Sequence, residues 1–184
     1  MRMIFAFLMV GVDGYHDTAD RDLSWHNVDA EFHEFAVEQL DEADTLLFGR
    51  RTYLHMAEFW PSPAARRVDP ATTERMNSYH KVVVSRTLDR AGWAPSTLIS
   101  DEVPVQLARL KEQPGRHIAL LGSSTLAASL LDLGLIDELR IMVNPVVLGA
   151  GHPVLAGARH ARLSLARRRE FRSGNILLTY EASR

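Results

Sequence analysis

The feature that most constrains the fold of this chain is a series of short, nearly continuous apolar runs. The clearest are MIFAFLMV, TLLFG, KVVV and IALLG, and segments with helical spacing separate them. A strand has this composition when both of its faces are buried, as in a parallel sheet that is covered by helices. The order therefore predicts an α/β fold with a mostly parallel central sheet and flanking helices.

Helices are expected at several places between these strands. Residues 27–43 place apolar side chains on one side of a helix and acidic ones mostly on the other, and either Asn27 or Asp29 can cap its start. A short helical turn follows TLLFG and is broken at WPSP, and a polar stretch through Asn77 is compatible with a further helix. Residues 103–113 and 123–134 complete the set, the last closed by Gly134.

The C-terminal part of the sequence contains strand patterns without helices between them. The segments IDELRIMVNPVVLG, ARLSLARRREFRS and NILLTYEAS predict antiparallel strands that close the sheet. No internal repeat or linker interrupts the 184 residues, so we expect one domain over residues 1–184.

Charge and cysteine content limit the classes of function. A formal net charge of -2 gives no global attraction for nucleic acid or an anionic membrane, so anion binding would depend on local clusters. The absence of cysteine excludes a thiolate nucleophile and a cysteine metal site and fits a reducing interior, so we expect a cytoplasmic protein. The apolar run at residues 3–10 is short for a signal peptide, has no small-residue cleavage site after it, and cannot span a bilayer.

Three of the predicted strands end in small, hydroxyl or cationic residues. Carboxyl ends of parallel strands meet at one edge of a sheet, so one ligand could contact all three turns. Helix starts present N–H groups to phosphates, and guanidinium groups bind phosphate oxygens in pairs. Each turn alone also fits an ordinary helix cap or a solvated helix start, but their recurrence favours a phosphorylated nucleotide. The residues concerned are Gly49, Arg50, Arg51 and Thr52, then Ser85, Arg86 and Thr87, then Gly122, Ser123, Ser124 and Thr125.

Five segments in order carry a resemblance to a known family: GVDGY, DTLLFGRRTY, KVVVSRTL, IALLGSSTLAASLLDLGLIDEL and NPVVLGAGHPVL. Together they resemble the dihydrofolate reductase-like superfamily, and most closely the C-terminal reductase domain of bacterial riboflavin biosynthesis, the RibD C-terminal family. The resemblance covers nearly the whole chain. It implies a dihydrofolate reductase-like fold, NADPH as the hydride donor and a pteridine- or pyrimidine-like small molecule as the substrate.

The resemblance also implies roles for the three turns. Residues 49–52 match the family's turn that approaches the cofactor phosphates, and Ser85 and Arg86 match its contact with the 2′-phosphate of the adenine ribose. Residues 122–125 match its pyrophosphate turn, although relatives usually have a second glycine where this chain has Ser123. The zinc signature of cytidine deaminases is missing from the sequence, as expected if the chain corresponds to the reductase half alone.

Carboxylates are the candidates for the chemical step, because a reductase must help to deliver a proton. Asp13 matches a family position beside the nicotinamide, and Asp29 and Glu31 lie near the place of the substrate-binding carboxylate in dihydrofolate reductases. The alternatives are a turn aspartate for Asp13 and favourable charge at a helix N-terminus for the other two. Trp25 resembles a substrate-loop tryptophan, whereas Trp60 is expected in the core.

Other motifs favour no different chemistry. The eight histidines lack the spacing of a helix-borne zinc pair, so no metal is expected, and no nucleophile elbow frames a serine. The segment ARRRE is typical of the solvated face of a strand and is no nucleic-acid footprint. The sequence thus predicts an NADPH-dependent reductase, with a non-catalytic nucleotide-binding or interaction module and a hydrolase as alternatives. We also expect a homodimer, because relatives pair and the run IDELRIMVNPVVLG offers more apolar surface than a sheet edge should expose.

Overall fold

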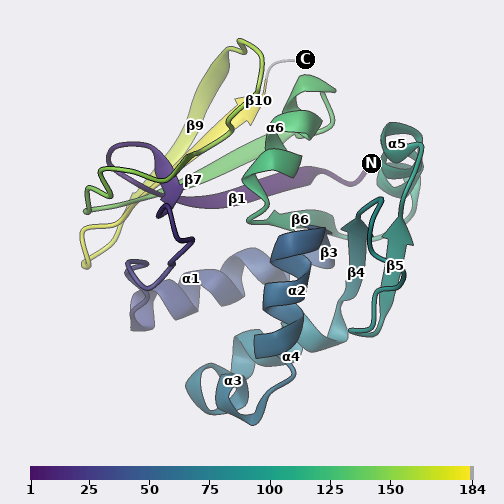
Figure 1. Ribbon diagram of the computed structural model, residues 1–184, viewed down its shortest axis with the longest axis horizontal. Coiled ribbons are helices and arrows are strands. Elements are labelled where there is room, and N and C mark those ends of the chain that lie inside the picture. Colours follow the sequence, from purple (N-terminus) through teal and green to yellow (C-terminus); the bar gives the residue numbers. More distant parts are fainter. Residues whose placement is uncertain (183–184) are drawn as a thin grey trace.

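An eight-stranded sheet forms the centre of the computed structural model, which describes residues 1–182 (Figure 1). The strand order is β5-β4-β3-β6-β1-β7-β10-β9, parallel from β5 to β7 and antiparallel for β10 and β9. The predicted fold class is therefore confirmed. The strands are β1 (Ile4–Gly11), β3 (Ala43–Gly49), β4 (His80–Val84), β5 (Ser96–Ile99), β6 (His117–Leu121), β7 (Glu138–Asn144), β9 (Leu163–Glu170) and β10 (Ile176–Ala182).

Helices cover both faces of the sheet (Figure 1). Helices α1, α2 and α4 pack on one face, and α5 and α6 pack on the other. A separate two-stranded sheet pairs β2 (Tyr15–Asp17) with β8 (His152–Pro153) beyond the carboxyl end of β1. The helices are α1 (Ala30–Asp41), α2 (Arg50–Phe59), α3 (Pro63–Val68), α4 (Pro70–Ser78), α5 (Val103–Glu112) and α6 (Ser124–Asp132).

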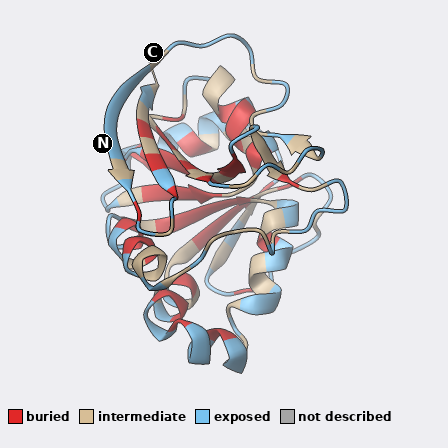
Figure 2. Cartoon of the chain, turned by 90° about the vertical axis from the view of Figure 1, so that its left-hand side faces the viewer, coloured by how far each residue is buried: buried red, intermediate tan, exposed pale blue. Residues whose placement is uncertain are grey.

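Alternate residues of β1 belong to two different hydrophobic cores. Phe5 and Phe7 join the core under α1, where the ring of Phe7 lies 5.6 Å from that of Phe35. Ile4, Ala6 and Leu8 join the core under α5 and α6. Both faces of the strand are thus removed from water, as the buried central strands in Figure 2 show, and this explains the unbroken apolar run. Burying each large side chain contributes roughly 1.5–3 kcal/mol.

Several local predictions needed correction. Helix α2 has ten residues and is more than a short turn, although it does end at the WPSP break. Strand β7 ends at Asn144, so the following PVVLG is a loop, and β7 lies between β1 and β10 in the interior of the sheet. The strand part of the apolar run that suggested a homodimer is therefore covered within the chain, whereas Val147 in the following loop is exposed, and the edge strands of the sheet are β5 and β9. Strands β2 and β8 had no counterpart in the sequence prediction.

The ends of the helices agree better with the sequence. Asp29 is the N-cap of α1, and its carboxylate accepts a hydrogen bond from the backbone N–H of Phe32 at 2.9 Å. Gly134 follows α6 with φ +66°. Trp60 packs against the core beside α2, as expected. No helix in the described part of the chain is long and apolar enough to cross a membrane.

Candidate functional site

The carboxyl ends of β4, β3, β6 and β1 lie side by side along one edge of the sheet. Gly49 at the end of β3 pairs in register with Val84 at the end of β4. Leu121 at the end of β6 pairs with Phe7 of β1. The turns after these strands are consequently neighbours, which is the convergence that the sequence predicted. Ligands bind at this edge in sheets of this kind.

Two helices begin at this edge without a capping side chain. Gly49 precedes α2 and Ser123 precedes α6, and neither makes a side-chain cap to its helix. Within residues 1–182, the backbone N–H groups of residues 50–52 and 124–125 donate to no protein group. Unpaired N–H groups at the positive end of a helix are what binds phosphate in many nucleotide sites.

Three arginines surround these helix starts without an acidic partner. Arg50, Arg51 and Arg86 are exposed, and none of them forms an ion pair within the described chain. Two of them stand in the first turn of α2, where the helix dipole disfavours positive charge. An anion bound at this edge would remove that repulsion and use the guanidinium groups as donors.

A groove extends from the turn after β4 along the outer part of the sheet. It has a cavity volume of about 480 Å³ and is lined by the ends of β4 and β5, the start of α5 and one side of α6. Arg86 and the buried Ser85 contribute from the turn after β4, and Asp101 and Glu102 contribute from the loop before α5. The oxygen Oγ of Ser85 accepts hydrogen bonds from two following backbone N–H groups, which fixes the turn.

The predicted carboxylates lie at the same edge, beyond β1 and β7. Asp13 is exposed, and its Oδ2 accepts a hydrogen bond from Gly149 N–H at 2.8 Å. Glu31 accepts one from Arg172 N–H at 2.9 Å, and Asp29 caps α1. Each of the three carboxylates thus accepts one backbone hydrogen bond and has a local structural role.

The segment before α1 carries Trp25 at the same end of the fold. Its indole Nε1 donates to the carbonyl of Asp22 at 3.0 Å, and its ring stands edge-on to His26 at 4.4 Å. The pKa of His26 falls to about 4, mainly because the ring is buried. The backbone of Asn27 donates to Asn144 Oδ1 at 3.0 Å, which joins this segment to the end of β7.

An aspartate and histidine pair beside this segment was not found by sequence reasoning. The Nδ1 of His152 lies 2.6 Å from Oδ1 of the buried Asp17, and the backbone N–H of His152 donates to the same oxygen. A Cβ on Gly151 would stand 1.9 Å from the carbonyl oxygen of Asp17, so only glycine permits this approach. The two residues are 135 positions apart and form no local motif, so the sequence pattern carries no signal for the pair.

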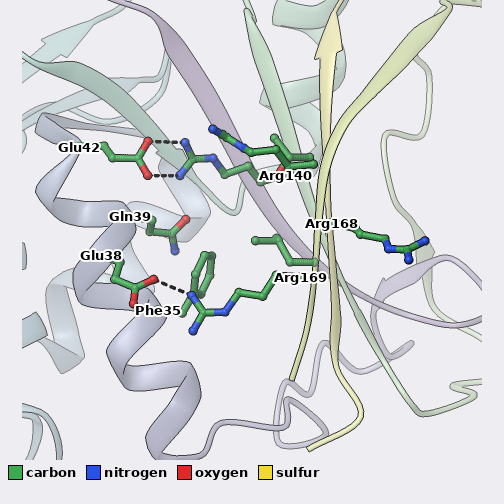
Figure 3. A pocket seen from close by; sticks show the side chains of 10 residues that line it. Phe35, Glu38, Gln39, Glu42, Arg140, Arg168 and Arg169 are labelled. Atoms are coloured by element: carbon green, nitrogen blue, oxygen red, sulfur yellow. Dashed lines mark hydrogen bonds and ion pairs between the residues drawn. The ribbon is translucent and has the colours of Figure 1, made fainter. Parts of the chain in front are cut away.

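A second groove lies between α1 and strands β7, β9 and β10 (Figure 3). Arg140 is paired there with both Glu42 and Glu138, and Arg169 donates to Glu38 at 2.6 Å. Arg168 points away from the groove. Arg140, Arg167 and Arg169 of this groove are thus paired with carboxylates, unlike Arg50, Arg51 and Arg86. Most of β9 is exposed, as expected for ARRRE.

The family comparison agrees with this geometry. The model of the RibD C-terminal domain matches residues 2–177. The chain is 30% identical over 186 residues to "Uncharacterized protein YyaP" of Bacillus subtilis (strain 168), with 97% of this chain and 94% of that protein covered.

Solved structures share the fold at low sequence identity. A crystal structure of a putative riboflavin biosynthesis protein from Shewanella sp. PV-4 is similar with a TM-score of 0.75 and 21% identity, and the match covers 99% of each chain. Dihydrofolate reductase from Enterococcus faecalis, complexed with NADP(H), has a TM-score of 0.59 and 16% identity, with 99% of this chain and 97% of that chain covered.

Proposed function

Because this chain belongs to the RibD C-terminal domain family, we propose that it is an NADPH-dependent reductase that transfers hydride to a pteridine- or pyrimidine-like small molecule. The fold and the family are those of reductases. The observation that carries the proposal is the group of three unpaired arginines beside two uncapped helix starts, on adjacent parallel strands. This set of donors suits a ligand with several phosphates.

The order of the residues along the edge suits a dinucleotide. Ser85 and Arg86 follow β4 and would hold the 2′-phosphate of the adenine ribose, in the groove described above. Residues 49–52 and 122–125 follow β3 and β6 and would hold the pyrophosphate with their N–H groups. Asp13 follows β1, the next strand, where the redox ring and the substrate would meet.

The residues of this chain would bind the cofactor, orient the substrate and help to deliver a proton to it. NADPH, when bound, supplies the hydride. Asp13, Asp29 and Glu31 are our candidates for holding the substrate ring or passing it a proton through water, and Trp25 is a candidate for contact with that ring. Asp13 is the first choice, because it stands two residues beyond a strand and its loop is fixed by Gly149.

Cofactor preference tests the proposal directly. NADPH should bind at least tenfold more tightly than NADH, because a charge-assisted contact to the 2′-phosphate is worth about 1.5–3 kcal/mol. Arg86→Ala should remove most of that preference, and Arg66→Ala, a change of another exposed arginine on α3, should leave it intact. Titration calorimetry measures both. Equal affinity of the wild-type protein for the two cofactors would contradict the assignment.

Turnover separates this proposal from a non-catalytic nucleotide-binding module. The backbone hydrogen bonds that occupy the three carboxylates are the observation in favour of that alternative. Loss of NADPH absorbance would be followed with dihydrofolate and with 5-amino-6-(5-phosphoribosylamino)uracil. Asp13→Asn should bind NADPH nearly normally and lose turnover. Tight NADPH binding without turnover of either compound would favour the module, and undiminished turnover in Asp13→Asn, Asp29→Asn and Glu31→Gln would remove the carboxylate mechanism.

The chemistry also suggests a location. A reductase of this kind uses a reduced nicotinamide cofactor, and the chain contains no cysteine that would need an oxidising compartment. We therefore propose that it acts in the cytoplasm. Fractionation of cells that express the protein without an added tag would test this.

A further inference from the structure

Ser123 has a backbone conformation that is unusual for a residue with a side chain. Its φ and ψ are +58° and +56°, in the left-handed region, directly after Gly122 with φ +61°. Glycine adopts this region freely, whereas Cβ makes it unfavourable for other residues. A serine in this conformation is therefore expected to make contacts through its hydroxyl group that offset the backbone cost.

The hydroxyl of Ser123 joins the starts of two helices. It accepts a hydrogen bond from Gly49 N–H at 2.8 Å, and it donates to Oγ1 of Thr52 at 2.8 Å. Gly49 and Thr52 both belong to the turn into α2, and Ser123 is the residue before α6. One side chain therefore fixes the spacing between the two sets of N–H groups that have no partner in residues 1–182.

The two turns also touch in a second place. A Cβ on Gly122 would be 3.2 Å from Cγ2 of Thr52, and one on Gly49 would be 3.1 Å from Oγ of Ser123. The neighbouring hydroxyl, that of Ser124, is already bound by Leu155 N–H at 2.7 Å. The hydroxyls of these serines thus serve the protein framework, and the backbone N–H groups are left for a ligand.

We propose that Ser123 is a positioning residue for the cofactor's pyrophosphate, acting through the two helix starts that its hydroxyl holds together. The inference rests on the proposed function and deepens it. Without the hydroxyl, the turns into α2 and α6 lose these side-chain hydrogen bonds between them, and the spacing of the two sets of N–H groups is less firmly fixed. A preorganised set of donors binds more tightly than one that must be ordered by the ligand.

Fragments of the cofactor show whether the loss of affinity in a Ser123 variant concerns the pyrophosphate. NADPH and 2′-phospho-ADP-ribose contain the pyrophosphate, and adenosine 2′-phosphate lacks it. Ser123→Ala should bind the first two roughly tenfold more weakly, which corresponds to about 1.4 kcal/mol, and should bind adenosine 2′-phosphate as the wild-type protein does. Titration calorimetry measures all three, and thermal melting without ligand reports folding. Ser78→Ala, a change of a serine on α4, is the matched control and should change none of them.

Two further variants sharpen the test. Ser123→Gly suits the backbone but lacks the hydroxyl, so it should melt no lower than Ser123→Ala and still bind NADPH about tenfold more weakly than wild type. Thr52→Val removes the acceptor, and adding it to Ser123→Ala should weaken binding less than the two single effects together, because both remove the same hydrogen bond.

The outcomes separate this inference from the proposed function. Ser123→Gly binding NADPH as tightly as wild type, or more tightly, overturns the positioning role. An equal loss of affinity for adenosine 2′-phosphate does so too, because it shows a general disturbance of the fold. A wild-type protein that binds neither NADPH nor adenosine 2′-phosphate refutes the proposed function itself and the positioning role with it.

Discussion

The buried ammonium group of Lys81 predicts how the stability of the protein depends on pH. The residue has no exposed surface. Its Nζ donates to the carbonyls of Asn77 at 2.7 Å and Ala94 at 3.2 Å, and it lies 4.5 Å from the ring centre of Trp93. No carboxylate forms an ion pair with it within residues 1–182. Burial consequently lowers the pKa of Lys81 from 10.5 to about 8.

The sign of the effect follows from proton binding in the two states. The unfolded chain keeps Lys81 protonated up to about pH 10.5, whereas the folded protein releases that proton above about pH 8. Between these values the unfolded state binds more protons, so the free energy of unfolding rises with pH. The interval is about 2.5 pH units. At about 1.4 kcal/mol per unit, Lys81 should add about 3 kcal/mol of stability across it.

The assay compares urea unfolding of wild type and Lys81→Met at several pH values in that interval. The difference isolates Lys81 from the other groups that titrate at high pH, and it should change by about 3 kcal/mol in favour of wild type as the pH rises. Lys111→Met is the control at the chain's other lysine, whose ammonium lies 2.5 Å from Asp137. It should destabilise the protein at neutral pH, because it removes the ion pair of a largely buried carboxylate. A difference between wild type and Lys81→Met that stays constant with pH would refute the reasoning.

Three other predictions concern the loops beyond the carboxyl end of β1 and the edge strand β9. Gly151→Ala should lower the free energy of unfolding by about 2 kcal/mol or more in urea titration, because its Cβ would stand 1.9 Å from Asp17 O. Burial lowers the pKa of His26 to about 4, so stability should fall as the pH drops from 6.5 towards that value, and His26→Asn should flatten the slope. We expect a homodimer that uses edge strand β9, where Leu165 is 54% exposed, and light scattering that gives one 20.6 kDa chain at micromolar concentration would contradict it.

The convergence of the three turns could be predicted because the information for each turn is local in the sequence. A strand end, the following turn and the helix start are consecutive, as in Gly49 to Thr52, so hydrophobic pattern and residue type suffice to locate them. The parallel order then brings the turns together without further detail. The same logic failed for β7, because an apolar run does not reveal whether its neighbours in the sheet are one strand or two.

The surroundings of the candidate carboxylates and of Asp17 were harder to predict, because their contacts depend on pairings between distant segments. Asp17 and His152 meet through β2 and β8, two very short strands whose three and two residues carry no periodic signal. The hydrogen bonds of Asp13 and Glu31 likewise join loops more than 130 residues apart, to Gly149 and Arg172. The sequence identified the two carboxylates as candidates, but it could not identify the backbone N–H groups that bind them, because these come from distant segments.

Ser123 shows how a residue can look wrong in the sequence and fit in the structure. Read along the chain, a serine in place of a glycine at a phosphate turn is an obstacle, since its Cβ occupies space and its backbone is unfavourable by roughly 1–2 kcal/mol. In the fold, the two hydrogen bonds of its hydroxyl, each worth about 1 kcal/mol, are of the right size to offset that cost. The balance leaves little net stability, so the consequence of the serine should appear mainly in the affinity for the proposed cofactor.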